Sequence, residues 1–247
     1  MKPLMRLVIA MQLLLPGMAV PEEGADPYAA ARQAMVEAIR NDASTLHREL
    51  RLDALDANVL AALGTLPRHE FVAEKLRGTA YANRPLPIGY GQTISQPTIV
   101  ALMTNLLKPK PGQRVLEVGT GSGYQAAVLA QLGVRVLSIE IIAPLAESAR
   151  ERLRRLGYDK VEVRTGDGYY GWEEAAPFDG IIVTAAANHI PPPLIAQLKS
   201  NARMVIPVGN PFGTQHLTIV QKDASGRVTT QKILPVRFVP FTGRQRP

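Results

Sequence analysis

Apolar residues in the first quarter of the chain recur at the spacing of an α-helix. Ala30 and Ala34 lie four positions apart, and Asp26-Pro27 just before them is a typical helix start. A second helical pattern follows, and together the two predict helices within residues 25–66. Residues 77–95 hold several prolines and glycines and are predicted to be irregular.

Beyond residue 95 the pattern alternates between helical segments and short apolar runs. Such runs suit strands that are buried on both faces of a sheet. The predicted order is a helix at 96–107, a strand at 114–118, a helix at 124–132, a strand at 134–140, a helix at 144–156, strands at 161–165 and 178–184, a helix at 192–198 and a strand at 202–207. Strand–helix–strand repeats form a parallel sheet with right-handed crossovers.

The end of the chain has a different pattern. Alternating residues at 216–221 and 227–235 flank the turn-forming run Asp223-Ala224-Ser225-Gly226, which predicts an antiparallel hairpin. The predicted fold class is therefore α/β. We expect a doubly wound, Rossmann-like sheet that is mostly parallel, with antiparallel edge strands and a helical N-terminal extension.

Residues 1–24 form a signal-like segment. Lys2 and Arg6 precede the apolar stretch Leu7–Leu15, and Gly17-Met18-Ala19 has the small-x-small pattern of a cleavage site. The stretch is shorter than the about 20 apolar residues that span a membrane, so we expect no stable span. A cleaved secretory signal and an ordinary N-terminal extension both stay open.

Composition restricts the chemistry that the chain can perform. It has no cysteine, which excludes disulfides, thiolate catalysis and cysteine metal sites, and its four histidines are scattered, so we expect no metal. The net charge of +7 would suit a nucleic acid. At 147–155, however, glutamates interleave with the arginines and aromatic residues are absent, so we expect no nucleic-acid partner. We also expect a monomer.

The most informative motif joins the strand at 114–118 to the helix behind it. It runs Gly119-Thr120-Gly121-Ser122-Gly123, at the first turn of what would be a nucleotide-binding βαβ unit. Glycines let the backbone approach a ligand, and the helix N-terminus offers free N–H groups. A strict dinucleotide pattern needs glycine at Tyr124, yet the looser pattern Gly121-x-Gly123-x-x-Ala126 is met. The loop alone leaves the nucleotide open.

The charge beside the loop favours S-adenosylmethionine over a dinucleotide. Glu117, at the end of the strand, would face the anionic pyrophosphate of a dinucleotide unfavourably. S-adenosylmethionine has no phosphate, and an acidic residue attracts its ammonium and sulfonium groups. The alternative for Glu117 is a solvated side chain beside a structural turn.

Glu140 and Asp167 end the next two predicted strands, so with Glu117 they form a row of acids at successive strand ends. A carboxylate at Glu140 is placed to accept both ribose hydroxyls. Asp167, followed by Gly168, is predicted to accept from the adenine amino group. Its alternative is a turn role, because Asp-Gly is a common turn pair.

Five segments of the chain, in addition to these acidic residues, indicate which family of proteins the sequence resembles. They are Pro67-Arg68-His69-Glu70-Phe71-Val72, Asn83–Pro97, Val115–Tyr124, Gly166–Trp172 and Arg237–Gly243. Together they resemble the protein-L-isoaspartate (D-aspartate) O-methyltransferase family over roughly residues 55–243. The block Thr93-Ile94-Ser95-Gln96-Pro97 is the most specific, because general methyltransferases lack it. About the first 50 residues fall outside the resemblance.

The resemblance implies transfer of a methyl group from S-adenosylmethionine to the free α-carboxylate of L-isoaspartyl residues in damaged proteins and peptides. Ser95 matches the family's active-site serine; chemistry alone would equally make it the N-cap of the next helix. The expected peptide site comprises Thr93, Ile94 and the stretch Val239-Pro240-Phe241-Thr242. His189 follows a strand, and we expect it to border the cofactor without acting as a base.

One methyltransferase domain is expected at 25–247. It divides into a helical, substrate-side region at 25–95, a cofactor-binding core at 96–210, and C-terminal strands with a substrate-side loop at 211–247. Family resemblance and cofactor supply favour the cytoplasm. Export to the periplasm is the alternative if residues 1–19 are a cleaved signal.

Three other functions compete with this one. A methyltransferase acting on nucleic acid or a small molecule would use the same cofactor fold, but Thr184-Ala185-Ala186-Ala187 stands where amino-methylating DNA enzymes have an aromatic–proline motif. Glu117 argues against a nicotinamide-dependent oxidoreductase. The intact Thr93–Pro97 block and Glu117 argue against a binding module that has kept only the fold.

Overall fold

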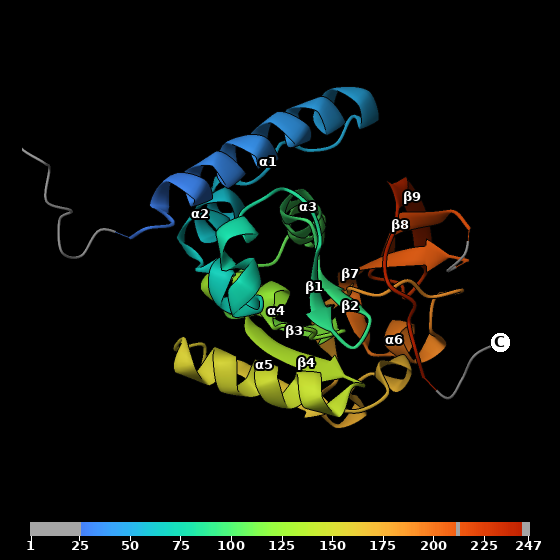
Figure 1. Ribbon diagram of the computed structural model, residues 1–247. Helices are drawn as coiled ribbons and strands as arrows, with labels where there is room; N and C mark the ends of the chain where they lie inside the picture. Colours follow the sequence, from blue (N-terminus) through green and yellow to red (C-terminus); the bar gives the residue numbers. More distant parts are fainter. Residues whose placement is uncertain (1–25, 211–212, 244–247) are drawn as a thin grey trace, which may run out of the picture.

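Seven strands form the central sheet of the computed structural model, which describes residues 26–210 and 213–243 (Figure 1). Their order is β5-β4-β3-β6-β7-β8-β9; neighbours from β5 to β7 are parallel, and β8 and β9 each run antiparallel to the strand before them. The strands are β3 (Arg114–Val118), β4 (Arg135–Glu140), β5 (Val161–Thr165), β6 (Phe178–Val183), β7 (Leu198–Gly209), β8 (Gln215–Lys222) and β9 (Val228–Val236). This sheet confirms the predicted fold class.

Helices connect and cover these strands. The α-helices are α1 (Ala29–Leu50), α2 (Ala57–Thr65), α3 (Pro97–Leu107), α4 (Tyr124–Gln131), α5 (Ala143–Arg155) and α6 (Pro192–Ala196), and short 3-10 helices are η1 (Arg68–Phe71), η2 (Glu74–Thr79), η3 (Gly168–Tyr170) and η4 (Glu173–Ala175). The elements predicted within residues 96–184 agree with these bounds to within one residue at each end.

The boundary between α6 and β7 was predicted wrongly. The helix predicted at 192–198 ends at Ala196, and β7 begins at Leu198 instead of residue 202. Leu198 pairs with Phe178 of β6, so the strand starts ahead of a polar stretch at 199–201 that resembles a loop in the sequence.

Residues 77–95 were predicted to be irregular, but they contain a hairpin. Its strands are β1 (Leu86–Gly89) and β2 (Gln92–Ile94), which form a separate two-stranded sheet. Both strands are edges, where a proline such as Pro87 is tolerated. Tyr90 and Gly91 have φ values of +52° and +70°, the left-handed backbone that tight hairpin turns require.

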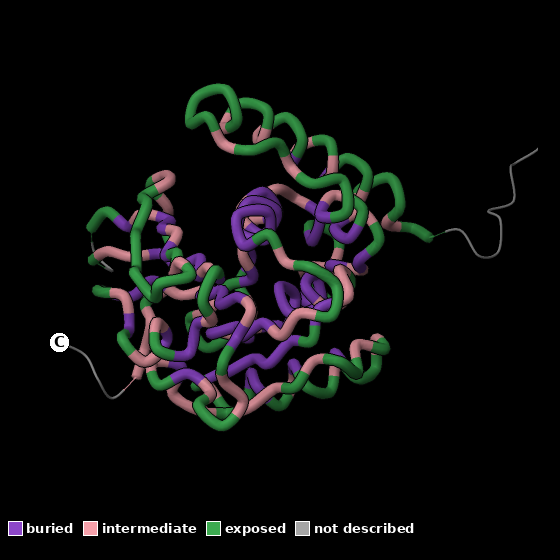
Figure 2. Tube along the Cα trace, turned by 180° about the vertical axis from the view of Figure 1, so that it is seen from behind, coloured by how far each residue is buried: buried purple, intermediate pink, exposed green. Residues whose placement is uncertain are grey.

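Alternate residues of the central strands face opposite sides of the sheet, and both sides are buried. Val115 and Ile182 belong to the apolar cluster that includes α3, whereas Leu116 and Ile181 belong to the cluster that includes Leu194 of α6. Helix α3 is buried along almost its whole length, while α1 is largely exposed (Figure 2). Helices thus cover both faces, as a doubly wound sheet requires.

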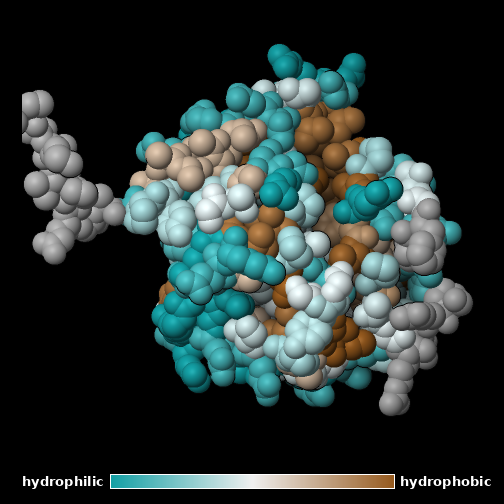
Figure 3. Space-filling view, in the orientation of Figure 1, coloured by the Kyte–Doolittle hydropathy of each residue, from teal (hydrophilic) through white to brown (hydrophobic). Residues whose placement is uncertain are grey.

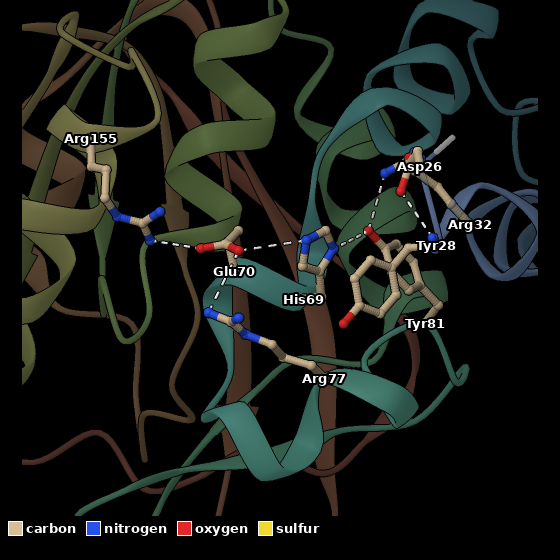
Figure 4. Close-up of polar contacts among 8 residues, drawn as sticks. All are labelled: Asp26, Tyr28, Arg32, His69, Glu70, Arg77, Tyr81 and Arg155. Carbon is tan, nitrogen blue, oxygen red and sulfur yellow. Dashed lines mark hydrogen bonds and ion pairs between the residues drawn. The ribbon is translucent and has the colours of Figure 1, made fainter. Parts of the chain in front are cut away.

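The N-terminal helix α1 is attached through a cluster of aromatic and charged side chains (Figure 4). The ring of Tyr28 stacks on His69 with centroids 3.9 Å apart, and the Tyr81 hydroxyl lies 2.8 Å from His69 Nδ1. Arg32 pairs with Asp26 and donates to the Tyr81 hydroxyl at 3.2 Å. Burial lowers the pKa of His69, so the cluster favours its neutral form. The helical extension is therefore packed onto the segment that contains η1 and η2.

The predicted signal-like segment, residues 1–24, lies outside the described residues. Among the helices that the structure describes, none is long and apolar enough to cross a membrane. The domain boundary placed at residue 25 stays a prediction.

Candidate active site

A cavity opens at the carboxyl ends of β3, β4 and β6, where the strand order reverses. Open α/β sheets bind their ligands at such a switch point. Thirteen of the sixteen predicted site residues line this switch-point cavity: Thr93, Ile94, Ser95, Gly119, Thr120, Gly121, Ser122, Glu140, Gly168, Val239, Pro240, Phe241 and Thr242. Glu117, Gly123 and Asp167 lie outside its lining.

Gly119 begins the loop that follows β3. Its φ of +100° is a conformation that favours glycine, and a Cβ there would lie 2.5 Å from Thr184 Oγ1. The Thr184 hydroxyl donates to the Gly119 carbonyl at 2.6 Å, which joins the loop to the end of β6. Position 119 therefore requires glycine both for its backbone and for the close approach of Thr184.

Glu140 ends β4 with its carboxylate between two backbone N–H groups. Oε2 accepts from Gly121 at 2.8 Å, and Oε1 accepts from Ile142 at 2.9 Å. Each carboxylate oxygen has a further lone pair, so Glu140 can accept two more hydrogen bonds from hydroxyl groups in the cavity. This arrangement suits the predicted contact with a ribose diol.

Glu117 lies beneath the loop. It is fully buried, so the alternative of a solvated side chain is wrong. The Ser138 hydroxyl donates to Oε2, while Oε1 has no hydrogen-bond partner in the described part of the chain. Burial raises the pKa of Glu117 to about 8; the Ser138 hydrogen bond opposes this rise, and the nearby Glu140 carboxylate adds to it. The carboxyl group is mostly protonated at neutral pH, and a positive charge brought near it would favour ionisation.

Asp167 and Gly123 lie next to the cavity without lining it. Asp167 Oδ1 accepts from the Tyr169 N–H at 3.0 Å, which is the turn role offered as its alternative. Gly123 has a φ of +88°, and a Cβ there would lie 3.1 Å from Leu153 Cδ1. Contact of Gly123 or Asp167 with the cofactor stays a prediction.

Ser95 lies where the switch-point cavity meets a second cavity, because it lines both of them. Thr93, Thr184 and Val239 also line both cavities. The N-cap of α3 is Gln96, one residue after Ser95, and it makes no side-chain capping bond. The alternative that Ser95 caps the helix is therefore wrong, and the serine lies at the boundary between two spaces.

The C-terminal segment Val239–Thr242 returns to the sheet beside Ala186. The Ala186 N–H donates to the Val239 carbonyl at 2.9 Å, and the Phe241 N–H donates to the Ala186 carbonyl at 2.8 Å. These bonds fix the segment along the edge of the switch-point cavity. Apolar side chains lie in the hollow between the β1–β2 hairpin and this segment (Figure 3).

Some lining residues were absent from the sequence predictions. Ile141 and Ile142 follow Glu140 and line the cavity. Their signal in the sequence was a pair of apolar residues directly after an acidic strand end. His189 was expected to border the cofactor, but it lies outside the cavity lining, and its Nε2 is 3.3 Å from the Tyr169 hydroxyl.

The lining suits S-adenosylmethionine better than a dinucleotide. No lysine or arginine of the described chain lines the cavity, so no side-chain cation there would pair with a pyrophosphate, whereas the Glu140 carboxylate would repel it. The Glu140 carboxylate can accept hydrogen bonds from the two ribose hydroxyls of a nucleoside. Within residues 26–210 and 213–243, no group of three or more histidine, cysteine and acidic side chains is placed to hold a metal.

The doubly wound sheet, glycine loop and acidic strand ends define a Rossmann-like methyltransferase. The model of the protein-L-isoaspartate(D-aspartate) O-methyltransferase family matches residues 41–246. The chain therefore belongs to this family. The match begins within α1, earlier than the resemblance in the sequence had indicated.

Individual relatives resemble the chain over most of their length. Protein-L-isoaspartate O-methyltransferase 2 of Syntrophobacter fumaroxidans is 62% identical over 218 residues, 88% of each protein. Protein-L-isoaspartate O-methyltransferase 1 of Cupriavidus necator is 55% identical over 238 residues, 96% of this chain and 91% of that protein.

Two solved structures share the fold. A protein-L-isoaspartate O-methyltransferase superposes with a TM-score of 0.75 at 27% identity, over 86% of this chain and 66% of that one. The Plasmodium falciparum member, solved in complex with S-adenosyl-L-homocysteine, superposes with a TM-score of 0.68 at 26% identity, over 85% of this chain and 98% of that one.

Proposed function

We propose that the protein transfers a methyl group from S-adenosylmethionine to the free α-carboxylate of L-isoaspartyl residues in damaged proteins and peptides, which starts their repair. The observation that carries the proposal is the position of Ser95, in the family-specific block Thr93–Pro97, between the two cavities. A relative with this fold was solved with S-adenosyl-L-homocysteine, which supports S-adenosylmethionine as the cofactor, and the glycine loop and Glu140 in its lining favour the switch-point cavity as the cofactor site. The second cavity then receives the peptide.

The reaction requires binding and alignment by the protein and needs no general base. The substrate carboxylate has a pKa of about 4, so it is ionised and nucleophilic at neutral pH. Bound S-adenosylmethionine supplies the electrophilic methyl group. Alignment of two reactants can contribute about 7–11 kcal/mol in ideal cases, which is enough to make positioning the main task of the site.

Different residues of the two cavities bind the cofactor and align the peptide. Glu140 and the N–H groups of the glycine loop hold the nucleoside, and the Ser95 hydroxyl donates to the substrate carboxylate at the boundary. The backbone of Val239–Thr242 binds the peptide in an extended form, which makes recognition tolerant of the surrounding sequence. Ile94 and Phe241 supply apolar surface that excludes water from the reacting groups.

A paired-peptide assay tests the proposal. The protein is incubated with labelled S-adenosylmethionine and two peptides that differ only in an isoaspartyl or aspartyl linkage at one position. Base-labile label on the isoaspartyl peptide alone is expected, because mild base hydrolyses a methyl ester. Equal labelling of both peptides, or labelling of neither peptide, would contradict the proposal. In parallel incubations with RNA, DNA or a small molecule in place of the peptides, label on any of these would support the alternative methyltransferase.

Ser95→Ala is expected to lower turnover of the isoaspartyl peptide about 10- to 100-fold, because a hydrogen bond to a charged group is lost. The dissociation constant for S-adenosylhomocysteine should stay close to that of the wild type. Steady-state kinetics and calorimetry measure the two effects. Ser200→Ala, on an exposed part of β7, is the matched control and should leave both unchanged. An unchanged turnover in Ser95→Ala would remove the serine from the reaction.

We infer that the protein acts as a monomer without a nucleic-acid partner. Exposed basic residues are partly neutralised by ion pairs, such as Arg135 with Glu162 at 2.7 Å and Arg164 with Glu174 at 3.0 Å. Light scattering is expected to give the mass of one chain. Salt-sensitive binding of a labelled DNA duplex or RNA at physiological ionic strength would contradict the inference.

The cytoplasm is the proposed compartment, since S-adenosylmethionine is made there. The signal-like segment is the reason to test it. N-terminal sequencing of the protein from its native cell is expected to find the chain uncleaved. A mature start near Val20 would mean export instead.

A further inference from the structure

Arg68, the first residue of η1, is a fully buried cation. No acidic side chain of the described chain forms an ion pair with it; burial lowers the pKa of Arg68, and the neighbouring Tyr124 and Tyr81 oppose that shift. Burying a charge without a partner of opposite charge is costly, on the order of several kcal/mol. The hydrogen bonds and the ring contact of the guanidinium must therefore offset the cost of burying the Arg68 charge.

The guanidinium connects three separate segments. Nε donates to the Ala80 carbonyl at 2.8 Å, and Nη2 donates to the Ser95 carbonyl at 2.7 Å. The guanidinium carbon lies 4.6 Å from the ring centroid of Tyr124, in a cation–π contact. Tyr124 is the first residue of α4, directly after the glycine loop. Arg68 therefore lies between the Ser95 segment and the cofactor loop.

Arg68 lines neither cavity, although the residues it holds do. Ser95 and Tyr124 both line the switch-point cavity, and Gln96 lines the second one. In a trans peptide the C=O and N–H groups point in opposite directions. A bond that fixes the Ser95 carbonyl therefore also fixes the direction of the Gln96 N–H on the other side of the segment.

We propose that Arg68 is a positioning residue for methyl transfer, which holds Ser95 against the cofactor loop through the Ser95 carbonyl and the Tyr124 ring. The inference rests on the proposed function for its kinetic consequence. Misplacing a reacting group by about 1 Å can lower a rate about 100-fold. The positive charge also polarises the Ser95–Gln96 peptide unit, so that its N–H becomes a better donor to an anionic substrate.

Arg68→Ala tests the proposal with two readouts, one of which needs no activity. Hydrogen exchange in fragments covering residues 90–100 is expected to become about tenfold faster, while fragments of β4 keep wild-type rates. The kcat for the isoaspartyl peptide is expected to fall about 10- to 100-fold. The dissociation constant for S-adenosylhomocysteine should change less than about threefold, because the change spares the residues that bind the nucleoside.

Chemical rescue separates positioning from simple loss of stability. Millimolar guanidinium is expected to raise the turnover of Arg68→Ala at least about fivefold, because it restores a planar cation between the two carbonyls and the Tyr124 ring. Urea has a similar shape without the charge and should not restore turnover. Arg68→Lys keeps the charge without the fork of donors, so its turnover should lie between those of the wild type and the alanine variant.

Arg203→Ala is the matched control. Arg203 also donates to a backbone carbonyl, that of Leu106 at 3.1 Å, but it lines neither cavity. This variant should lose stability and keep the wild-type kcat. Wild-type exchange rates at residues 90–100 in Arg68→Ala, or equal rescue by urea and guanidinium, would overturn the proposal. If the wild type fails to label the isoaspartyl peptide, the proposed function falls, and the exchange rates still decide whether Arg68 holds Ser95.

Discussion

Replacement of Gly119 by alanine is expected to weaken binding of S-adenosylhomocysteine at least about 100-fold, because strain and a collision together force the loop out of the conformation that approaches the cofactor. Alanine at a φ of +100° is strained by about 1–3 kcal/mol. Its Cβ would also lie 2.5 Å from Thr184 Oγ1, so the loop or β6 must move. Because the same hydroxyl donates to the Gly119 carbonyl, that movement breaks the bond joining the loop to the sheet. At 1.4 kcal/mol for each factor of ten, about 3 kcal/mol suffices for the expected loss.

Gly112→Ala is the matched control for this prediction. Gly112 has a φ of +81°, and a Cβ there would meet no atom within 4 Å, so the substitution introduces strain without a collision. It should lower the unfolding temperature and leave the binding constant near that of the wild type. Calorimetric titration of both variants makes the comparison. Binding by Gly119→Ala within threefold of the control would mean that the loop does not approach the cofactor closely.

The location of the site could be predicted because it depends on topology. Gly119 follows β3 and Glu140 is the last residue of β4, and parallel strands bring their carboxyl ends to one edge of the sheet. The helices and strands within residues 96–184 could be predicted because their apolar patterns are long and regular. Where polar residues open a strand, as at 199–201 in β7, the same reasoning failed.

The contacts between separate elements could not be predicted in this way. The cap of α3 lies at Gln96 because Pro97 takes the first helical position, and one residue of difference decides what Ser95 does. Arg68 donates to carbonyls 12 and 27 residues away, at a distance where local patterns carry no information. The burial of Glu117 likewise depends on Ser138 of the neighbouring strand.

Glu117→Gln is expected to be more stable than the wild type in the ligand-free state, and this difference in stability is expected to increase as pH rises. The unfolded chain loses the Glu117 proton near pH 4.5, whereas the folded protein keeps it until about pH 8. The folded state therefore binds more protons between these values, and its stability falls with rising pH across that window. Glutamine removes this term, so the difference in unfolding free energy between variant and wild type should grow from pH 5 to pH 8 and then level off, on the order of a few kcal/mol. Glu162→Gln, at an exposed ion pair, should show no such growth.

Binding of the cofactor should shift the pKa of Glu117 in the opposite direction from burial, that is, downward. S-adenosylmethionine brings an ammonium and a sulfonium, and positive charge near Glu117 lowers the pKa that burial has raised. Binding at pH 7 should therefore release a fraction of a proton from the wild type, and affinity should increase as pH rises toward 8. Calorimetry in buffers of different ionisation enthalpy measures the released proton. Equal proton release by the wild type and Glu117→Gln would show that the buried carboxyl stays protonated and that the cofactor's charge is met elsewhere in the cavity.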